Sequence, residues 1–100
     1  MTPDDEFPLA SPHSVMVTLP VALMNLFPGC LARVELSAST IRDVIDALDR
    51  RWPGMRDRIC DSTPGIRRHI NVFVEDERAT LETHLKRGAE VIIMTAISGG

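Results

Sequence analysis

The sequence predicts an α+β fold in which one long helix packs on one face of a mixed sheet. Two segments with period-two alternation of apolar residues precede a segment with helical spacing, and two further strand-like segments follow it. The chain has 100 residues, of which 44% are hydrophobic and 25% charged. This length and composition favour a single globular domain over a disordered or fibrous chain. One long helix can then cover one face of the sheet, which defines the class.

The first two strands are predicted on either side of an apolar connection. SVMVTLP, residues 14–20, alternates apolar and polar residues and ends at a proline, and ARVELSAS, residues 32–39, alternates in the same way. Their proximity along the chain favours a hairpin. The connection, VALMNLFPGC at 21–30, is apolar where a loop is normally polar. It is either a cap on the core or a partner surface, and Phe27 is its candidate contact residue.

The clearest helix is predicted within STIRDVIDALDRRWP, residues 39–53. Its apolar residues recur at i, i+3, i+4 and i+7, which gives a stripe that can lie on a sheet. Ser39 or Thr40 is the expected N-cap, and the Pro-Gly pair at 53–54 is expected to end the helix. A short second helix is predicted at 55–59 from the i,i+4 spacing of Met55 and Ile59.

The last two strands are predicted in HINVFV, residues 69–74, and EVIIMTAI, residues 90–97. The segment between them contains either a short strand or a helical turn, so we expect a sheet of four to five strands. The expected domain spans residues 14–97. Residues 1–13, acidic and rich in proline, are expected to form a flexible tail, and residues 98–100 a second one.

Charge and hydropathy bear on partners and location. The net charge of −3 gives no basic excess for nucleic acid. No apolar run approaches the length of about 20 residues that spans a bilayer, and the acidic start differs from a secretory signal. We therefore expect a cytoplasmic protein that binds neither nucleic acid nor a membrane.

No constellation of catalytic or metal-ligating residues is evident. Cys30 and Cys60 form no CxxC pair, and the three histidines lack metal-ligand spacing. The serines and threonine before the long helix read as capping residues rather than nucleophiles. We therefore expect reduced thiols, no metal and no bound cofactor, and a chain that is not an enzyme.

Several motifs together resemble the MoaD/ThiS family of ubiquitin-like sulfur carriers. HINVFV is followed by a turn, by LxTxL at 81–85, by Gly88 and Val91, and by a terminal Gly-Gly pair. Within the family, TLP, STIRDVIDALDRRWPG and RRHINVFV are similar to the subgroup that serves cysteine biosynthesis. The resemblance extends from about residue 14 to residue 100.

The resemblance implies a β-grasp fold, with the first and last strands parallel at the sheet centre. It also implies that an E1-like enzyme adenylates the Gly100 carboxylate with ATP and that a thiocarboxylate then forms. A sulfurtransferase or sulfide source and a downstream sulfur-accepting synthase are the other implied partners. Ser98 and Gly99 would thread into the partner, because glycine has no Cβ to obstruct a narrow passage.

Three questions stay open from the sequence. Ile92, Met94 and Ile97 either pack in the core or, with Phe27, form a partner-docking surface, since a strand sends alternate side chains to opposite faces. The product pathway could be that of cysteine, molybdopterin or thiamine. The alternative function is a ubiquitin-like modifier that is conjugated to lysines through Gly100.

Overall fold

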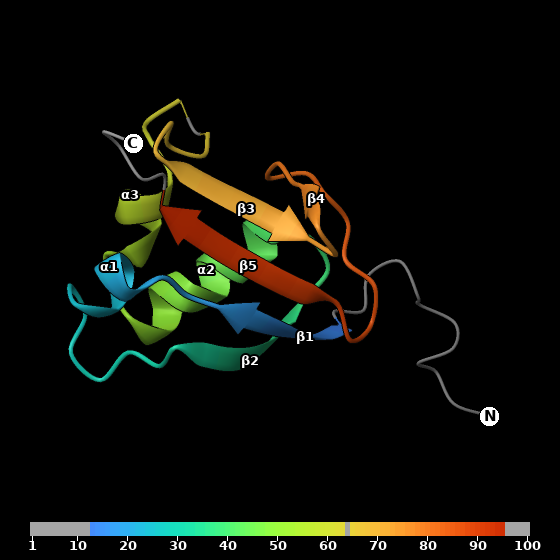
Figure 1. Cartoon of the computed structure of the whole chain (residues 1–100), viewed down its shortest axis with the longest axis horizontal. Helices are drawn as coiled ribbons and strands as arrows, with labels where there is room; N and C mark the ends of the chain where they lie inside the picture. The colour runs from blue at the N-terminus through green and yellow to red at the C-terminus, as the bar shows by residue number, and fades with distance from the viewer. Residues whose placement is uncertain (1–12, 64, 96–100) are drawn as a thin grey trace.

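The computed structural model describes residues 13–63 and 65–95. Figure 1 shows a sheet with its helices gathered on one side. The elements follow one another as β1 (His13–Thr18), α1 (Val21–Met24), β2 (Arg33–Ala38), α2 (Ile41–Arg51), α3 (Met55–Ile59), β3 (Ile70–Val74), β4 (Glu77–Arg78) and β5 (Glu90–Thr95). The predicted α+β class is confirmed.

The sheet has the strand order β2-β1-β5-β3-β4. β1 and β2 form the predicted antiparallel hairpin, and β1 pairs in parallel with β5 at the sheet centre. β3 is antiparallel to both β5 and β4. This central parallel pair is the arrangement that the β-grasp resemblance implies. Because β1 and β5 are parallel, the chain enters the sheet at His13 on the side opposite to the end of β5.

One face of the sheet forms the core with α2. Val15, Val17, Val72, Val91 and Ile93 are at most 1% exposed, as the alternation of their strands predicts. From α2, the buried residues are Ile41, Val44, Ile45, Ala47 and Leu48. Burying a large aliphatic side chain contributes about 1.5–3 kcal/mol, so these two layers supply the main stabilisation of the fold.

The start of α2 is fixed by a capping box, with Thr40 rather than Ser39 as the N-cap. The Oγ1 of Thr40 accepts a hydrogen bond from the Asp43 N–H, and the Asp43 carboxylate accepts one from the Thr40 N–H, each at 3.2 Å. The N–H groups of Ile41 and Arg42 donate to carbonyls of Thr83 and Leu81. These bonds satisfy donors that the helix itself leaves unpaired, and they tie α2 to the segment after β4.

The junction between α2 and α3 depends on one carboxylate. Asp49 accepts hydrogen bonds from the backbone N–H groups of Gly54, at 3.0 Å, and Arg56, at 2.9 Å. The hydrogen bond from Arg56, followed by the one from Gly54, lowers the pKa of the Asp49 carboxyl. Gly54 adopts φ +100° at this reversal, a conformation that side chains with a Cβ rarely adopt. The predicted short helix at 55–59 is confirmed.

Three details differ from or refine the expectations. The connection after β1 contains a four-residue helix, α1, where a loop was expected. The segment between β3 and β5, for which either a short strand or a helical turn was expected, forms a two-residue strand, β4, and turns. β1 begins at His13, one residue before the expected boundary of the domain. Residues 1–12 of the expected tail at 1–13, the end of the domain near residue 97 and the expected tail at 98–100 lie outside the described residues.

Candidate functional site

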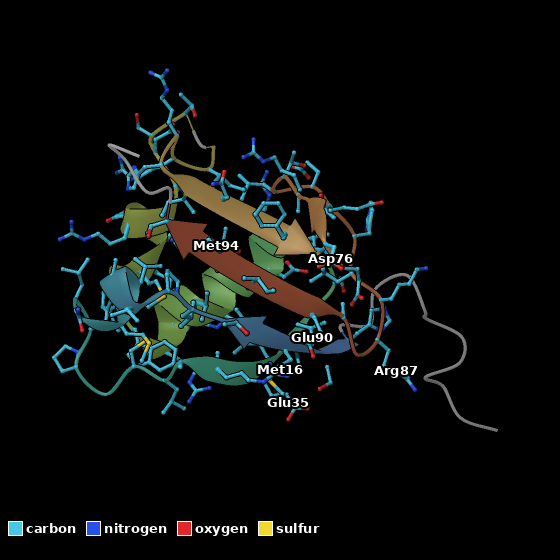
Figure 2. All side chains as sticks on the ribbon, viewed as in Figure 1. Met16, Glu35, Asp76, Arg87, Glu90 and Met94 are labelled. Atoms are coloured by element: carbon cyan, nitrogen blue, oxygen red, sulfur yellow. The ribbon has the colours of Figure 1, made fainter. Side chains whose placement is uncertain are left out.

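The sheet face opposite α2 carries a small group of apolar side chains. Met16 of β1, Phe73 of β3, and Ile92 and Met94 of β5 occupy strand positions that alternate with the core residues. Met94 is 47% exposed and the other three are half-buried. We call these four residues the open face. Figure 2 shows Met16 and Met94 on the strands in front, with α2 behind the sheet.

Strand pairing explains why these residues lie together. Ile92 pairs with Phe73 on one side and with Thr18 on the other, and Met94 pairs with Asn71. Directly paired residues of neighbouring strands have Cβ atoms about 4.5–5.5 Å apart. The structure therefore brings Ile92 and Met94 into one continuous surface across the three central strands.

Charged side chains border the open face on the β1–β2 side. Arg33 Nη2 and Glu90 Oε2 form an ion pair at 3.1 Å, and Ser14 donates a hydrogen bond to Glu35. Both members of the ion pair are about half exposed, so the pair contributes little to stability. An apolar centre with a polar border is the usual composition of a protein-docking surface.

Phe27 lies apart from the open face. It is half-buried, packs against the core, and its ring lies beside Gly54. Around it, the connection from β1 to β2 exposes Val21 at 68% and Leu26 and Leu31 at 49% each. This apolar connection follows β1 and therefore lies at the same end of the sheet as the end of β5. It forms a second exposed apolar region near the exit of the chain.

The reacting group implied by the resemblance lies beyond the end of β5. The described part of the chain reaches Thr95, which pairs with Ile70. Ile97, Ser98, Gly99 and Gly100 lie outside the described residues. The five residues from Ala96 to Gly100 are AISGG, which could extend about 17 Å beyond the sheet. The described residues therefore form the platform that precedes this segment.

The two cysteines are free thiols. Burial is the main cause that raises the pKa of both the Cys30 and the Cys60 thiol, so neither has the thiolate character of a reactive cysteine at neutral pH. Within residues 13–63 and 65–95, no group of three or more His, Cys, Asp and Glu could hold a metal ion. None of the helices in this part is long and apolar enough to cross a membrane.

Sequence reasoning identified Ile92 and Met94 but did not select Met16 or Phe73 for the same surface. Their alternation with core residues is visible in the strands, but it indicates only that they point away from the core. Placing them beside Ile92 requires the β1–β5 and β3–β5 registers. A parallel alignment of the two central strands, which the resemblance implied, was the signal that could have found Met16.

Comparisons with known proteins agree with this fold. The ThiS family model matches residues 18–100. A chain of the BexX/CysO complex from Amycolatopsis orientalis is similar with a TM-score of 0.76 and 31% identity, over 86% of this chain and 99% of that one. CysO from Mycobacterium tuberculosis is similar with a TM-score of 0.75 and 29% identity, over 83% and 99% of the two chains.

A third similar structure is SAMP1 from Haloferax volcanii, with a TM-score of 0.73 and 26% identity, over 87% of this chain and 99% of that one. Among curated protein sequences, none is similar enough to count as a match. The sheet order, the covered and open faces and the family match all describe a ubiquitin-like β-grasp domain. The chain belongs to the ThiS family.

Proposed function

We propose that this chain is a sulfur carrier whose Gly100 carboxylate is activated and converted to a thiocarboxylate. The observation that carries the proposal is the family match, which runs through β5 and includes Gly99 and Gly100. The central position of β5 supports it, because this strand is paired on both sides and its last residue, Thr95, precedes the Gly-Gly pair by only three intervening residues. The chain acts as a co-substrate, and the chemistry occurs in the active site of a partner.

The first step is adenylation by an E1-like enzyme. A Gly100 carboxylate oxygen attacks the α-phosphorus of ATP, and pyrophosphate leaves. Hydrosulfide, supplied directly or released from the persulfide of a sulfurtransferase by a thiol reductant, then attacks the carbonyl carbon of the acyl-adenylate. A C–S bond forms, the C–O bond to AMP breaks, and AMP leaves. ATP is used by the partner, and the carrier itself binds no cofactor.

Activation is needed because a free carboxylate resists nucleophilic attack, whereas AMP is a good leaving group. The last residues must enter the partner's active site. Glycine suits this role because it has no Cβ to obstruct a narrow passage or to restrict φ. The open face, centred on Ile92 and Met94, is the proposed docking surface, together with Ile97 and the Phe27 connection. Apolar docking would hold the carrier while its last residues reach the nucleotide.

The acceptor in this proposal is a synthase of cysteine biosynthesis. The similarity to two CysO chains supports this choice, as do the motifs STIRDVIDALDRRWPG and RRHINVFV. Molybdopterin and thiamine synthesis are the other candidate pathways. The acceptor can be identified by supplying the thiocarboxylated chain to each candidate synthase and measuring loss of sulfur from the carrier.

The test is to co-express the chain with its E1-like enzyme and a sulfur source and to measure the intact mass. The proposal predicts a product in which one oxygen is replaced by sulfur. A chain truncated after Ser98 is the matched control, and it should show no exchange. An unmodified wild-type chain beside a demonstrably active partner would contradict the proposal.

A second candidate function is a ubiquitin-like protein modifier. The similarity to SAMP1, a small archaeal modifier protein, favours it. Both functions begin with the same adenylate, but in the modifier a lysine amine displaces AMP and an isopeptide bond forms. Recovery of peptides in which Gly100 is joined to target lysines would establish this function, which the truncation after Ser98 should again abolish.

A further inference from the structure

A concentration of positive charge adjoins the open face at the β4 edge of the sheet, where Arg78 pairs with Phe73. A cavity of about 460 Å³ lies between the segments that flank β3 and β4. Its charged lining consists of four arginines and one glutamate: Arg42, Arg67, Arg68, Arg78 and Glu82. We call this cavity the arginine groove. It is basic although the whole chain carries a net charge of −3.

Among the residues that the structure describes, one of the four groove arginines is neutralised by an ion pair. Arg42 forms an ion pair with Glu82. Arg67 Nε donates to the backbone carbonyl of Asp57 at 2.9 Å, and Arg78 donates to the Asn71 side chain. Across the described residues, the ion pairs involve Arg33, Arg42 and Arg56, and none involves the other three groove arginines. Three guanidinium groups therefore have donors to offer an anion.

A neighbouring acidic side chain outside the groove, that of Asp61, is held by other donors. Asp61 lies close enough to Arg67 to interact with its charge. However, its carboxylate accepts hydrogen bonds from the backbone N–H groups of Thr63 and Gly65, each at 3.0 Å. Asp61 thus offsets part of the charge of Arg67, while Arg68 and Arg78 keep theirs.

The strand beside the groove is closed to main-chain pairing. In the described structure, β4 pairs with Phe73 and Val74, and the Ala79 N–H donates to the Val72 carbonyl. The Ile70 N–H donates to the Arg67 carbonyl, and Ile70 and Val72 are only 4% and 1% exposed. An acidic segment would therefore be held by the guanidinium groups that line the groove and not by strand pairing.

The location of the groove points to a partner rather than to the acidic N-terminal segment of this chain. Ile70 pairs with Thr95, so the groove reaches the end of β5 from which the chain continues to Gly100. His13, where the N-terminal segment joins the sheet, pairs with Ala38 at the opposite end. A protein that receives Gly100 would therefore lie next to the groove.

We propose that the arginine groove binds an acidic segment of the protein that activates Gly100. This inference rests on the proposed function for the identity of the partner. The binding chemistry itself depends only on Arg67, Arg68 and Arg78, so the two can fail separately.

The direct test uses a fluorescein-labelled peptide of alternating valine and aspartate and measures fluorescence anisotropy on titration with the chain. A peptide of alternating valine and lysine is the control and should not bind. Arg68→Gln should weaken binding by about threefold, and Arg68→Gln with Arg78→Gln by about tenfold. Arg50→Gln, an exposed arginine of α2 outside the groove, should leave binding unchanged. Added salt should weaken binding, because exposed charges are screened.

Several outcomes would overturn the proposal. Equal binding by wild type and the double variant would show that the groove is not used, provided that both unfold at the same temperature. Displacement of the peptide by an equal concentration of inorganic phosphate would indicate a small-anion site instead. If removal of residues 1–12 strengthened peptide binding about tenfold, the chain's own Asp4–Glu6 segment would be the occupant of the groove. A tenfold change corresponds to about 1.4 kcal/mol in the binding free energy of the peptide.

A second arm separates this inference from the proposed function. With the E1-like enzyme, Arg68→Glu should raise KM for the carrier with little change in kcat, because the groove contributes to docking and not to chemistry. If the Arg68→Glu variant formed thiocarboxylate with an unchanged KM, the proposed role of the groove in docking would be wrong, while the sulfur-carrier function would stand. Absence of thiocarboxylate in the wild type would overturn that function, and the peptide titration would still decide the chemistry of the groove.

Discussion

The two faces of the sheet use the same strands for different purposes. On the covered face, Val17 and Val91 are fully buried against α2. On the open face, one residue away along each strand, Met16 is half-buried and Ile92 likewise. The covered face has its apolar partner within this chain. The open face has none among the described residues, so its apolar groups are available to another protein.

This difference separates stability from function within single strands. Substitutions on the covered face should lower the free energy of unfolding, and substitutions on the open face should affect docking. A variant in which both quantities changed together would show that the separation is wrong. The following predictions test it, beginning with the largest expected effect.

Leu48→Ala tests the covered face. Leu48 is fully buried in α2, and truncation of such a side chain removes its transfer free energy and leaves a cavity. We expect the free energy of unfolding to fall by about 2–5 kcal/mol, measured by urea denaturation. Met94→Ala on the open face is the matched control and should cost less than about 1 kcal/mol. Equal losses in the two variants would contradict the comparison.

Met94→Asp tests the open face. A carboxylate at this position would lose hydration on docking against an apolar partner surface without gaining a counter-ion. We expect kcat/KM for thiocarboxylate formation to fall about tenfold or more, equivalent to about 1.4 kcal/mol, mainly through KM. Arg50→Ala is the control outside this face. If the Met94→Asp variant folded and reacted at the wild-type rate, Met94 would not be part of the docking surface.

Thr40→Ala tests how firmly α2 is held on the covered face. The substitution removes the Oγ1 acceptor of the Asp43 N–H, so we expect a loss of about 1 kcal/mol in the free energy of unfolding. Thr40→Ser keeps the acceptor and should restore most of it. If Ser and Ala proved equally destabilising, the effect would come from the lost methyl group and not from the cap.

Asp49→Asn tests the junction of α2 and α3 through pH. Because the folded-state pKa of Asp49 is lowered, its stabilisation is fully present above the unfolded pKa of about 3.9. It is lost as pH falls through the folded pKa. The variant should therefore be less stable than wild type at neutral pH, and this difference should shrink in acid. Urea denaturation of both proteins across pH measures this difference, and a difference that stayed constant in acid would contradict the role given to the Asp49 carboxylate.

The sequence was sufficient to predict most of the elements that form the covered face and α2. Period-two alternation placed β1, β2, β3 and β5, and the i, i+3, i+4, i+7 stripe placed α2, because each pattern reflects burial against the one core. α1 was missed because its four residues are too few to show helical periodicity. β4 was left open for the same reason, since a two-residue strand is specified by pairing with β3 and not by its own sequence.

The open face was harder to predict for a physical reason. A residue such as Met16 points away from the core whether or not it belongs to a docking surface, and its neighbours depend on strand register. The arginine groove was harder still, because Arg67, Arg68 and Arg78 come from two segments that only the β3–β4 edge brings together. In the sequence, interleaved acidic residues favoured a solvated mixed-charge face.

The most direct test of the two-face account is a map of the amide signals of the 15N-labelled chain in contact with its E1-like enzyme. The account predicts shifts or broadening at Met16, Phe73, Ile92 and Met94, while the amides of Arg50 and Arg51 on α2 stay unchanged. Changes confined to α2 and α3, with the open face unaffected, would contradict it.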